Sequence, residues 1–257
     1  MEINLLALNL GNSRLALANF AAGELSEVVR IPHGERGNWE SALGESWSKL
    51  SAYDGAAIVA ASVNPTLEEP LAQAVEKVTG RRVLWIGKEI ELPVSVLTDE
   101  PEKTGVDRVL NVAAAYEQMG KACVVVDAGT AITIDCCNDN GDFLGGAIAP
   151  GISMMLDALH EKTALLPRID FDVPTGTFGR TTRDAILEGV YHGVRGMVKE
   201  LVEQYAEKLG QWPEIIATGG DAAKLFQGWE LIHAISPDLT LYGIALAYTE
   251  HHLHLET

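Results

Sequence analysis

Two strand–turn–strand segments with the same pattern, about half the chain apart, most constrain how this sequence can fold. One apolar run ends at residues 9–13 in Asn-Leu-Gly-Asn-Ser, and another ends at 127–130 in Asp-Ala-Gly-Thr. In each turn a glycine lets backbone N–H groups approach a phosphate, and a small hydroxyl adds a donor. A single copy is also typical of an ordinary hairpin, in which Asn, Asp and Gly are common. The pairing predicts a duplicated domain with a cleft between the halves.

A third glycine turn favours nucleotide binding. It reads Thr218-Gly219-Gly220 and follows the apolar run 215–217. The sequence contains neither a P-loop motif nor a Gly-x-Gly-x-x-Gly motif after a strand, so a P-loop enzyme or a dinucleotide-binding domain has little support. A carboxylate at a strand end, as at Asp127, can hold Mg²⁺ or another cation beside a phosphate.

Strand-like and helix-like segments alternate along the chain. Short apolar runs predict strands at 4–9, 56–61, 83–86, 123–126, 132–135 and 215–217, and helical spacing marks 67–78, 106–114 and 184–208. This alternation predicts an α/β fold whose strands are largely buried on both faces. We expect two domains, 1–118 and 119–257, with no obvious linker.

The charge balance excludes some classes of partner. The chain has 19 Lys and Arg against 36 Asp and Glu, for a formal net charge of −17. A polyanion would be repelled over most of such a surface, so we expect no nucleic-acid binding. An anionic substrate would need a local cation or a backbone cradle. No apolar run is long enough to cross a membrane, the N-terminus lacks the basic region of a secretory signal, and three cysteines are too few for a disulfide framework. We expect a cytoplasmic protein that does not associate with membranes.

Residues 104–108, Thr-Gly-Val-Asp-Arg, have two interpretations. Thr104 and Asp107 have the spacing of a capping box, and an acid in the first turn of a helix is favourable. Alternatively, Asp107 accepts a proton from a substrate hydroxyl while Arg108 holds a carboxylate in a bidentate fork. The spacing alone supports both equally.

Three further segments have mainly structural interpretations. The glycine-rich run 143–151 is either a closely packed strand or a wall of the site. Thr181 or Thr182 is an N-cap by default, although an exposed hydroxyl there could also contact a ligand. The three cysteines and the histidines of the C-terminal tail have no usual metal-ligand spacing, so we expect the cysteines to be small core residues.

Taken in order, these motifs resemble those of type III pantothenate kinases, which belong to the actin-like sugar-kinase superfamily. The resemblance covers nearly the whole chain. It runs through Asn9–Ser13, Ala61–Pro65, Gly105–Arg108, Asp127–Ala131, Phe143–Gly146, Pro150–Gly151, Thr163–Pro167 and Ala217–Gly220. Each motif is weak alone, but the ordered set is specific. It implies duplicated actin-like (ribonuclease H-like) domains with a nucleotide cleft between them.

The resemblance also implies an activity, the transfer of the ATP γ-phosphoryl group to the primary hydroxyl of pantothenate. This is the first step toward coenzyme A. The ATP-binding residues would be Asn9, Leu10, Gly11, Asn12, Ser13, Arg14, Leu15, Ala16 and Thr130. Pantothenate would be bound by Gly105, Val106, Asp107, Arg108 and Thr182, with Asp107 as the general base. Asp127 matches the ligand of a monovalent cation, K⁺ or NH₄⁺, and Mg²⁺ would accompany ATP. The family forms homodimers.

Two departures from the family pattern leave other functions open. The first loop begins with Asn9 where the family has Asp, and an amide brings no negative charge to Mg²⁺. Residues 98–101 read Thr-Asp-Glu-Pro where the family has Tyr-x-Asn-Pro, so an aromatic wall of the pantothenate pocket is missing. The alternatives are a weak or inactive relative with a ligand-binding regulatory role, and a kinase for another small hydroxylated acid.

Overall fold

The computed structural model describes residues 3–255, which form two compact α/β units. Within the described residues, unit 1 consists of 3–95, Asp99–Ala114 and 239–255, and unit 2 consists of Val96–Thr98 and Ala115–Asp238. The chain therefore crosses between units within a helix, close to the expected boundary at residue 118. The expected division differs at the C-terminus, because the last helix packs in unit 1.

Unit 1 contains a five-stranded sheet in the order β3-β2-β1-β4-β5. Its strands are β1 (Leu5–Leu10), β2 (Arg14–Ala21), β3 (Glu24–Pro32), β4 (Ala57–Ser62) and β5 (Leu84–Trp85). Its helices are α1 (Trp39–Ser48), α2 (Pro65–Thr79), the first part of α3 (Val106–Met119) and α7 (Leu239–Leu255), with short 3-10 helices at His33–Asn38 and Pro101–Lys103. The central strand β1 pairs antiparallel with β2 and parallel with β4.

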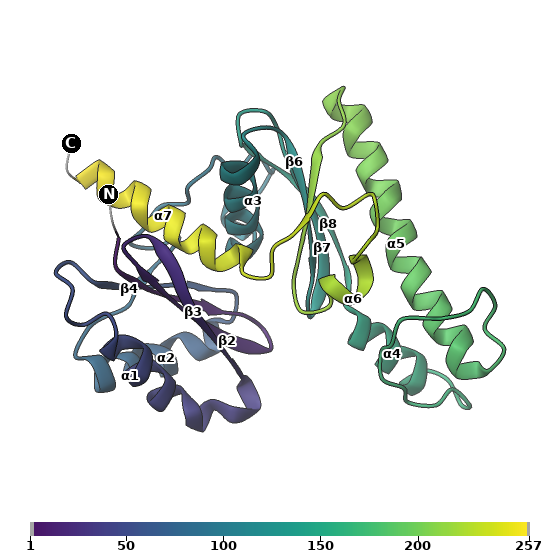
Figure 1. Cartoon of the computed structure of the whole chain (residues 1–257), viewed down its shortest axis with the longest axis horizontal. Helices are drawn as coiled ribbons and strands as arrows, with labels where there is room; N and C mark the ends of the chain where they lie inside the picture. The colour runs from purple at the N-terminus through teal and green to yellow at the C-terminus, as the bar shows by residue number, and fades with distance from the viewer. Residues whose placement is uncertain (1–2, 256–257) are drawn as a thin grey trace. The chain divides into compact units, whose positions relative to one another are not determined.

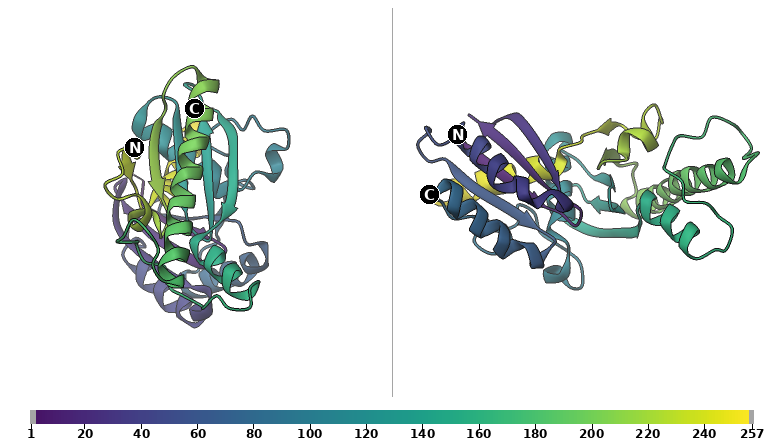
Figure 2. Two further views of the ribbon diagram at one scale, coloured as in Figure 1. Left: turned by 90° about the vertical axis from the view of Figure 1, so that its right-hand side faces the viewer. Right: turned by 90° about the horizontal axis from the view of Figure 1, so that it is seen from below.

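Helices cover both faces of this sheet (Figures 1 and 2). On one face Leu6, Leu8 and Leu10 pack against α1 and α2, and on the other Leu5 and Ala7 pack against α3 and α7. Successive residues of a strand point to opposite faces, so β1 reads as a continuous apolar run that is buried on both sides. The expectation of strands buried on both faces is confirmed here.

Unit 2 repeats the topology of unit 1, with a sheet in the order β10-β9-β6-β7-β8. Its strands are β6 (Cys123–Ala128), β7 (Ala131–Cys137), β8 (Phe143–Pro150), β9 (Glu214–Thr218) and β10 (Ala234–Ile235). Its helices are α4 (Ile152–Glu161), α5 (Thr182–Leu209) and α6 (Ala222–Phe226). The central strand β6 pairs antiparallel with β7 and parallel with β9, as β1 does with β2 and β4. The predicted duplicated α/β fold is therefore confirmed.

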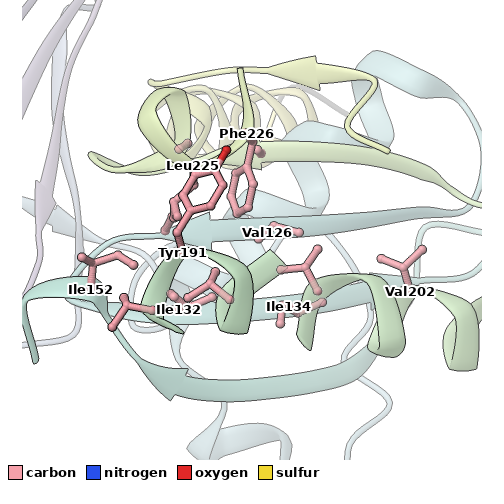
Figure 3. Packing of buried hydrophobic residues seen from close by; sticks show 14 of the residues in the cluster. Val126, Ile132, Ile134, Ile152, Tyr191, Val202, Leu225 and Phe226 are labelled. Atoms are coloured by element: carbon pink, nitrogen blue, oxygen red, sulfur yellow. The ribbon is translucent and has the colours of Figure 1, made fainter. Parts of the chain in front are cut away.

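One face of the unit 2 sheet carries the core of that unit (Figure 3). Val126, Ile132 and Ile134 pack there against α4, α5 and α6, with Phe226 and Val202 fully buried among them. The cysteines are buried as well, in agreement with their interpretation as small core residues. Within residues 3–255, no helix combines the length and apolar character that crossing a bilayer requires.

Candidate active site

The hairpin between β1 and β2 ends in an exposed turn. Asn9 pairs with Ala16 of β2 and Ala61 of β4, and the turn closes through the N–H of Gly11, which donates to the carbonyl of Arg14 at 3.1 Å. Residues 12–14 at its tip are exposed. The turn in unit 2 is shorter, because Ala128 pairs with Ile132 whereas Leu10 pairs with Leu15. The first hairpin thus has one more residue to wrap around a ligand.

The end of β4 lies beside this hairpin. The N–H of Val63 donates to the carbonyl of Leu10 at 3.1 Å, and the N–H of Asn64 donates to Oγ of Ser62 at 3.1 Å. Helix α2 then begins at Pro65, where a missing N–H does no harm. Because β1 and β4 are parallel, their carboxyl ends meet at one edge of the sheet, which is where open α/β sheets bind ligands.

The first turn of α3 and the side chain of Asn9 share one face of the unit 1 sheet. Val106 packs against the cluster that contains Ala16 and Ala61, the two residues paired with Asn9. Asn9 alternates with Leu5 and Ala7 of the same cluster and so points to that face. The structure therefore brings together two segments that the sequence analysis named separately, the first hairpin and the start of α3.

Asp107 lies in the first turn of α3 and is half-buried. Its Oδ1 accepts a hydrogen bond from the N–H of Arg108 at 2.8 Å. Burial raises the pKa of the Asp107 carboxyl, and the Arg108 N–H and guanidinium oppose this in part. A carboxylate with a raised pKa binds a proton more readily, which suits a general base. Gly105 leaves room for it, because a Cβ there would lie 2.9 Å from Oδ1.

Helix α7 fixes the position of α3 within unit 1. A Cβ on Gly243 would lie 2.3 Å from the carbonyl oxygen of Leu110, so only glycine allows this approach of the two helices. One turn away, Oγ1 of Thr240 donates to Oδ1 of the buried Asn111 at 2.7 Å. The C-terminal helix thereby supports the segment that carries Asp107 and Arg108.

In unit 2, two backbone segments converge on Asp127. This residue lies near the end of β6, on the face opposite the core cluster of Val124, Val126 and Ala128. Its parallel neighbour β9 ends at Thr218, and Gly219 follows with a φ of +95°. A Cβ on Gly219 would lie 2.4 Å from Oδ1 of Asp127, so glycine is required both by conformation and by space. The third glycine turn therefore adjoins the predicted cation ligand.

The end of β8 closes the other side of the same hairpin. The N–H of Gly151 donates to the carbonyl of Thr130 at 3.2 Å, and a Cβ on Gly151 would lie 2.4 Å from the carbonyl of Gly129. Helix α4 begins at the next residue, so its N-terminus lies at this edge of the sheet (Figure 1). The glycine-rich run is thus a strand, β8, whose end packs closely on the turn, while the side chain of Thr130 stays exposed.

The two threonines before the long helix have different positions. Oγ1 of Thr181 accepts a hydrogen bond from the N–H of Asp184 at 3.1 Å, so Thr181 is the N-cap of α5. Thr182 is the first residue of the helix and is exposed. Thr98 belongs to unit 2, where its Cγ2 would lie 3.8 Å from a Cβ on Gly145.

The sequence analysis did not single out His33, which lies against the first hairpin. Its backbone N–H donates to the carbonyl of Ser13 at 3.0 Å, and its Nε2 lies 2.8 Å from the carbonyl oxygen of Gly11. His33 follows a partly exposed strand and belongs to no sequence motif, so the sequence carries no signal for it. Only the pairing of β2 with β3 brings it to the hairpin.

Solved structures share this fold across nearly the whole chain. A Baf family protein of Campylobacter jejuni matches with a TM-score of 0.63 at 22% identity, covering 95% of this chain and 98% of that one. Component A of the (R)-2-hydroxyglutaryl-CoA dehydratase of Acidaminococcus fermentans matches with a TM-score of 0.54 at 13% identity, covering 99% and 100%. At these identities the likeness concerns the fold alone.

Sequence comparison is more specific. The pattern of the family described as "Type III pantothenate kinase" matches residues 5–204. A type III pantothenate kinase of Solibacter usitatus is 32% identical over 255 residues, which cover 96% of this chain and 97% of the relative. One of Dehalococcoides mccartyi is 38% identical over 191 residues, or 74% of each chain. Because the family pattern covers most of the chain and a relative that is 32% identical matches along nearly its whole length, this chain belongs to the type III pantothenate kinases.

Proposed function

We propose that this protein phosphorylates the primary hydroxyl of pantothenate with ATP, giving 4′-phosphopantothenate and ADP. The observation that supports this most is the position of Asp107, half-buried in the first turn of α3, on the sheet face that Asn9 also faces. Family membership supplies the substrate class. Because phosphoryl transfer depends mainly on positioning and on neutralising charge, these residues are suited to the task.

In the proposed reaction Asp107 removes the proton from the attacking hydroxyl. A new P–O bond forms to the γ-phosphorus, the bond from that phosphorus to the β–γ bridging oxygen breaks, and the proton passes to the Asp107 carboxylate. The raised pKa of Asp107 increases its affinity for that proton. Arg108, next in the helix, would hold the carboxylate of pantothenate as a bidentate partner, and Gly105, Val106 and the exposed Thr182 would also contact this substrate.

We propose that the exposed turn of the first hairpin binds phosphate oxygens of ATP through backbone N–H groups. Residues 9–16 would form this loop, with Thr130 as a further ATP contact in unit 2. Asn9 offers an oxygen for Mg²⁺, directly or through water, but no charge. Asp127 would hold the monovalent cation through its carboxylate, near the end of β6, where the backbone of Gly219 closely approaches Oδ1. When bound, the two cations would offset the repulsion between the polyphosphate and a chain of net charge −17.

A coupled assay of ADP release tests the reaction. Wild-type protein with Mg·ATP and K⁺ should turn over only when pantothenate is added. Binding of ATP and pantothenate without turnover would instead indicate a ligand-binding regulator. Turnover with another hydroxylated acid, and none with pantothenate, would show that the substrate is wrong. Replacing K⁺ with Na⁺ tests the cation, and we expect the rate to fall.

We further propose a homodimer that works in the cytoplasm. Unit 2 exposes several large apolar side chains, including Leu165 at 92%, Phe178 at 76% and Ile148 at 65%. A contiguous exposed apolar patch is typical of an interaction surface, and we propose that these side chains contribute to one. The three cysteines are buried and form no disulfide, which fits a reducing compartment. Light scattering should give twice the chain mass, and the double variant Leu165→Ser, Phe178→Ser should shift it toward the monomer. A wild-type monomer would contradict the proposal.

A further inference from the structure

We propose that His33 is a positioning residue that holds the first hairpin in the conformation that binds the phosphates of ATP. This inference rests on the proposed function. His33 lies in the 3-10 helix that follows β3 and is distant in sequence from the hairpin. Nothing in the motif pattern assigns it a role, but two of its groups hydrogen-bond the loop.

The two hydrogen bonds from His33 fix the orientation of two peptide groups in the turn. The backbone N–H of His33 donates to the carbonyl of Ser13 at 3.0 Å, and Nε2 contacts the carbonyl of Gly11 at 2.8 Å. All peptide bonds of the described residues are trans, so each carbonyl points opposite to the N–H of its own peptide group. The N–H groups of Asn12 and Arg14 therefore point away from His33.

This orientation is the one that anion binding needs. Asn12 is exposed, so an N–H that points away from His33 there can meet a phosphate oxygen; the N–H of Arg14 instead lies on the side of its own carbonyl, which accepts from Gly11 within the turn. Without the His33 side chain, the peptide that joins Gly11 to Asn12 would lose a hydrogen bond that the structure provides. Glycine has wide conformational freedom, so this peptide could rotate and turn its N–H away from the ligand. The expected consequence is weaker phosphate binding.

The surroundings of the ring hold the imidazole in one orientation. A carbonyl oxygen only accepts hydrogen bonds, so Nε2 carries a proton and donates to the Gly11 carbonyl. Nδ1 is buried and has no hydrogen-bond partner among the described residues, so the Nε2 contact is the polar contact that orients the ring. The ring also meets Trp39 edge-on, with centroids 6.0 Å apart, and Trp39 is only 3% exposed. Packing against the start of α1 thus holds the imidazole toward the loop.

Two substitutions separate positioning from mere support of the fold. In His33→Gln the amide N–H can occupy approximately the place of Nε2–H, whereas the shorter side chain of His33→Asn cannot reach the Gly11 carbonyl. Both replacements are neutral and polar. A matched control is His160→Leu, since Nδ1 of His160 also contacts a backbone carbonyl, that of Leu166, at 2.8 Å, but in unit 2.

We expect His33→Asn to raise the KM for ATP by about 3- to 10-fold, the range for losing one hydrogen bond. The KM for pantothenate and the Tm should change little, and His33→Gln should recover most of the ATP affinity. His160→Leu should leave both KM values unchanged. If His33→Asn left the KM for ATP within about twofold of wild type, or raised both KM values equally, or if Gln gave no rescue, the positioning role would be wrong.

A binding measurement keeps this test independent of the proposed reaction. Titration calorimetry with Mg·ADP reports phosphate binding even if pantothenate is not the substrate. We expect wild type and His33→Gln to bind Mg·ADP more tightly than His33→Asn. Equal Mg·ADP affinities in all three proteins would refute the role of His33. If the affinities differ as expected but wild type does not phosphorylate pantothenate, only the proposed function is refuted. If Asn at position 33 prevents folding, the Gln variant still decides, because loss of Mg·ADP affinity in a folded Gln protein would contradict a donor role.

Discussion

Replacing Asp107 with Asn should lower activity and raise stability in the same protein. The substitution removes the negative charge and keeps an oxygen that can accept the hydrogen bond from the Arg108 N–H, now 2.8 Å from Oδ1. Local geometry should therefore survive. Loss of a general base lowers turnover by about 10²–10⁴, which corresponds to about 3 to 5 kcal/mol in the activation free energy.

The gain in stability follows from the direction in which the fold moves the pKa. Burial raises the pKa of Asp107 in the folded protein above its ordinary value. The folded state then binds the proton more tightly than the unfolded state, so the contribution of Asp107 to stability is complete below the unfolded pKa and is lost as pH rises through the folded pKa. Above that pKa the ionised carboxylate destabilises the fold, by about 1.4 kcal/mol for every pH unit that separates the folded pKa from the unfolded pKa.

The assay combines kinetics with thermal unfolding at several pH values. At neutral pH Asp107→Asn should have a higher Tm than wild type, by about 2 °C or more for each kcal/mol, and the difference should shrink as the pH falls toward about 4. The control is Glu40→Gln, which removes an exposed acid from the first turn of α1; its solvent-exposed ion pair with Lys77 contributes little, so neither turnover nor Tm should change appreciably. Near-normal turnover of Asp107→Asn would remove it from the base role, and a lower Tm at neutral pH would refute the burial argument.

Four further substitutions test other parts of the site. Asn9→Asp should lower the Mg²⁺ concentration needed for half-maximal rate; an unchanged Mg²⁺ dependence would show that position 9 does not serve the metal. Gly219→Ala should lower the Tm and reduce stimulation by K⁺, because its Cβ would meet Asp127 at 2.4 Å and its φ of +95° disfavours a side chain; normal K⁺ dependence would separate Asp127 from the cation. Thr182→Ala should raise the KM for pantothenate, which steady-state kinetics would measure. Thr181→Ala should destabilise α5 by about 1 kcal/mol because the helix loses its N-cap, which an unfolding experiment would measure. The reverse pattern for the two threonines would overturn their assignment.

The sequence predicted the parts of the fold that have strong local signals. The repeated glycine turns marked the central hairpins of both units, and helical spacing over 184–208 anticipated α5, which spans Thr182–Leu209. Strand β3 was missed because it is half exposed and carries Glu24, Glu27 and Arg30. Helix α7 was missed because it is apolar on several sides, with Leu241, Ile244, Ala247 and others buried, so no amphipathic period stands out.

Residues of the candidate site could be predicted only where a reactive side chain lies at a strand end or a helix start that the sequence pattern also predicts. Asp107 and Asp127 were identifiable because each is an acid at the end of a strand or the start of a helix. At Asp107 the residue spacing supported a capping box and catalysis equally. Its half-buried position and raised pKa favour the catalytic interpretation, since an exposed capping acid would have neither. That Gly219 is required beside Asp127 depended on the parallel pairing of β6 with β9, two segments far apart in the chain.

The proposed role of His33 depends on the register between β2 and β3, which cannot be predicted from a local sequence pattern. Strands β2 and β3 pair with a bulge, since Asn19 lies opposite Glu27 and Phe20 opposite Leu25, and the extra residue, Ser26, donates its hydroxyl to the carbonyl of Asn19 at 3.1 Å. The bulge sets the register in which Arg14 meets Pro32, and His33 follows at the hairpin. A shift of one residue turns each side chain of a strand to the other face. Without that bulge, the residue that reaches the Gly11 carbonyl would not be a histidine. The register of the edge strand β3 therefore determines which side chain contacts the first hairpin.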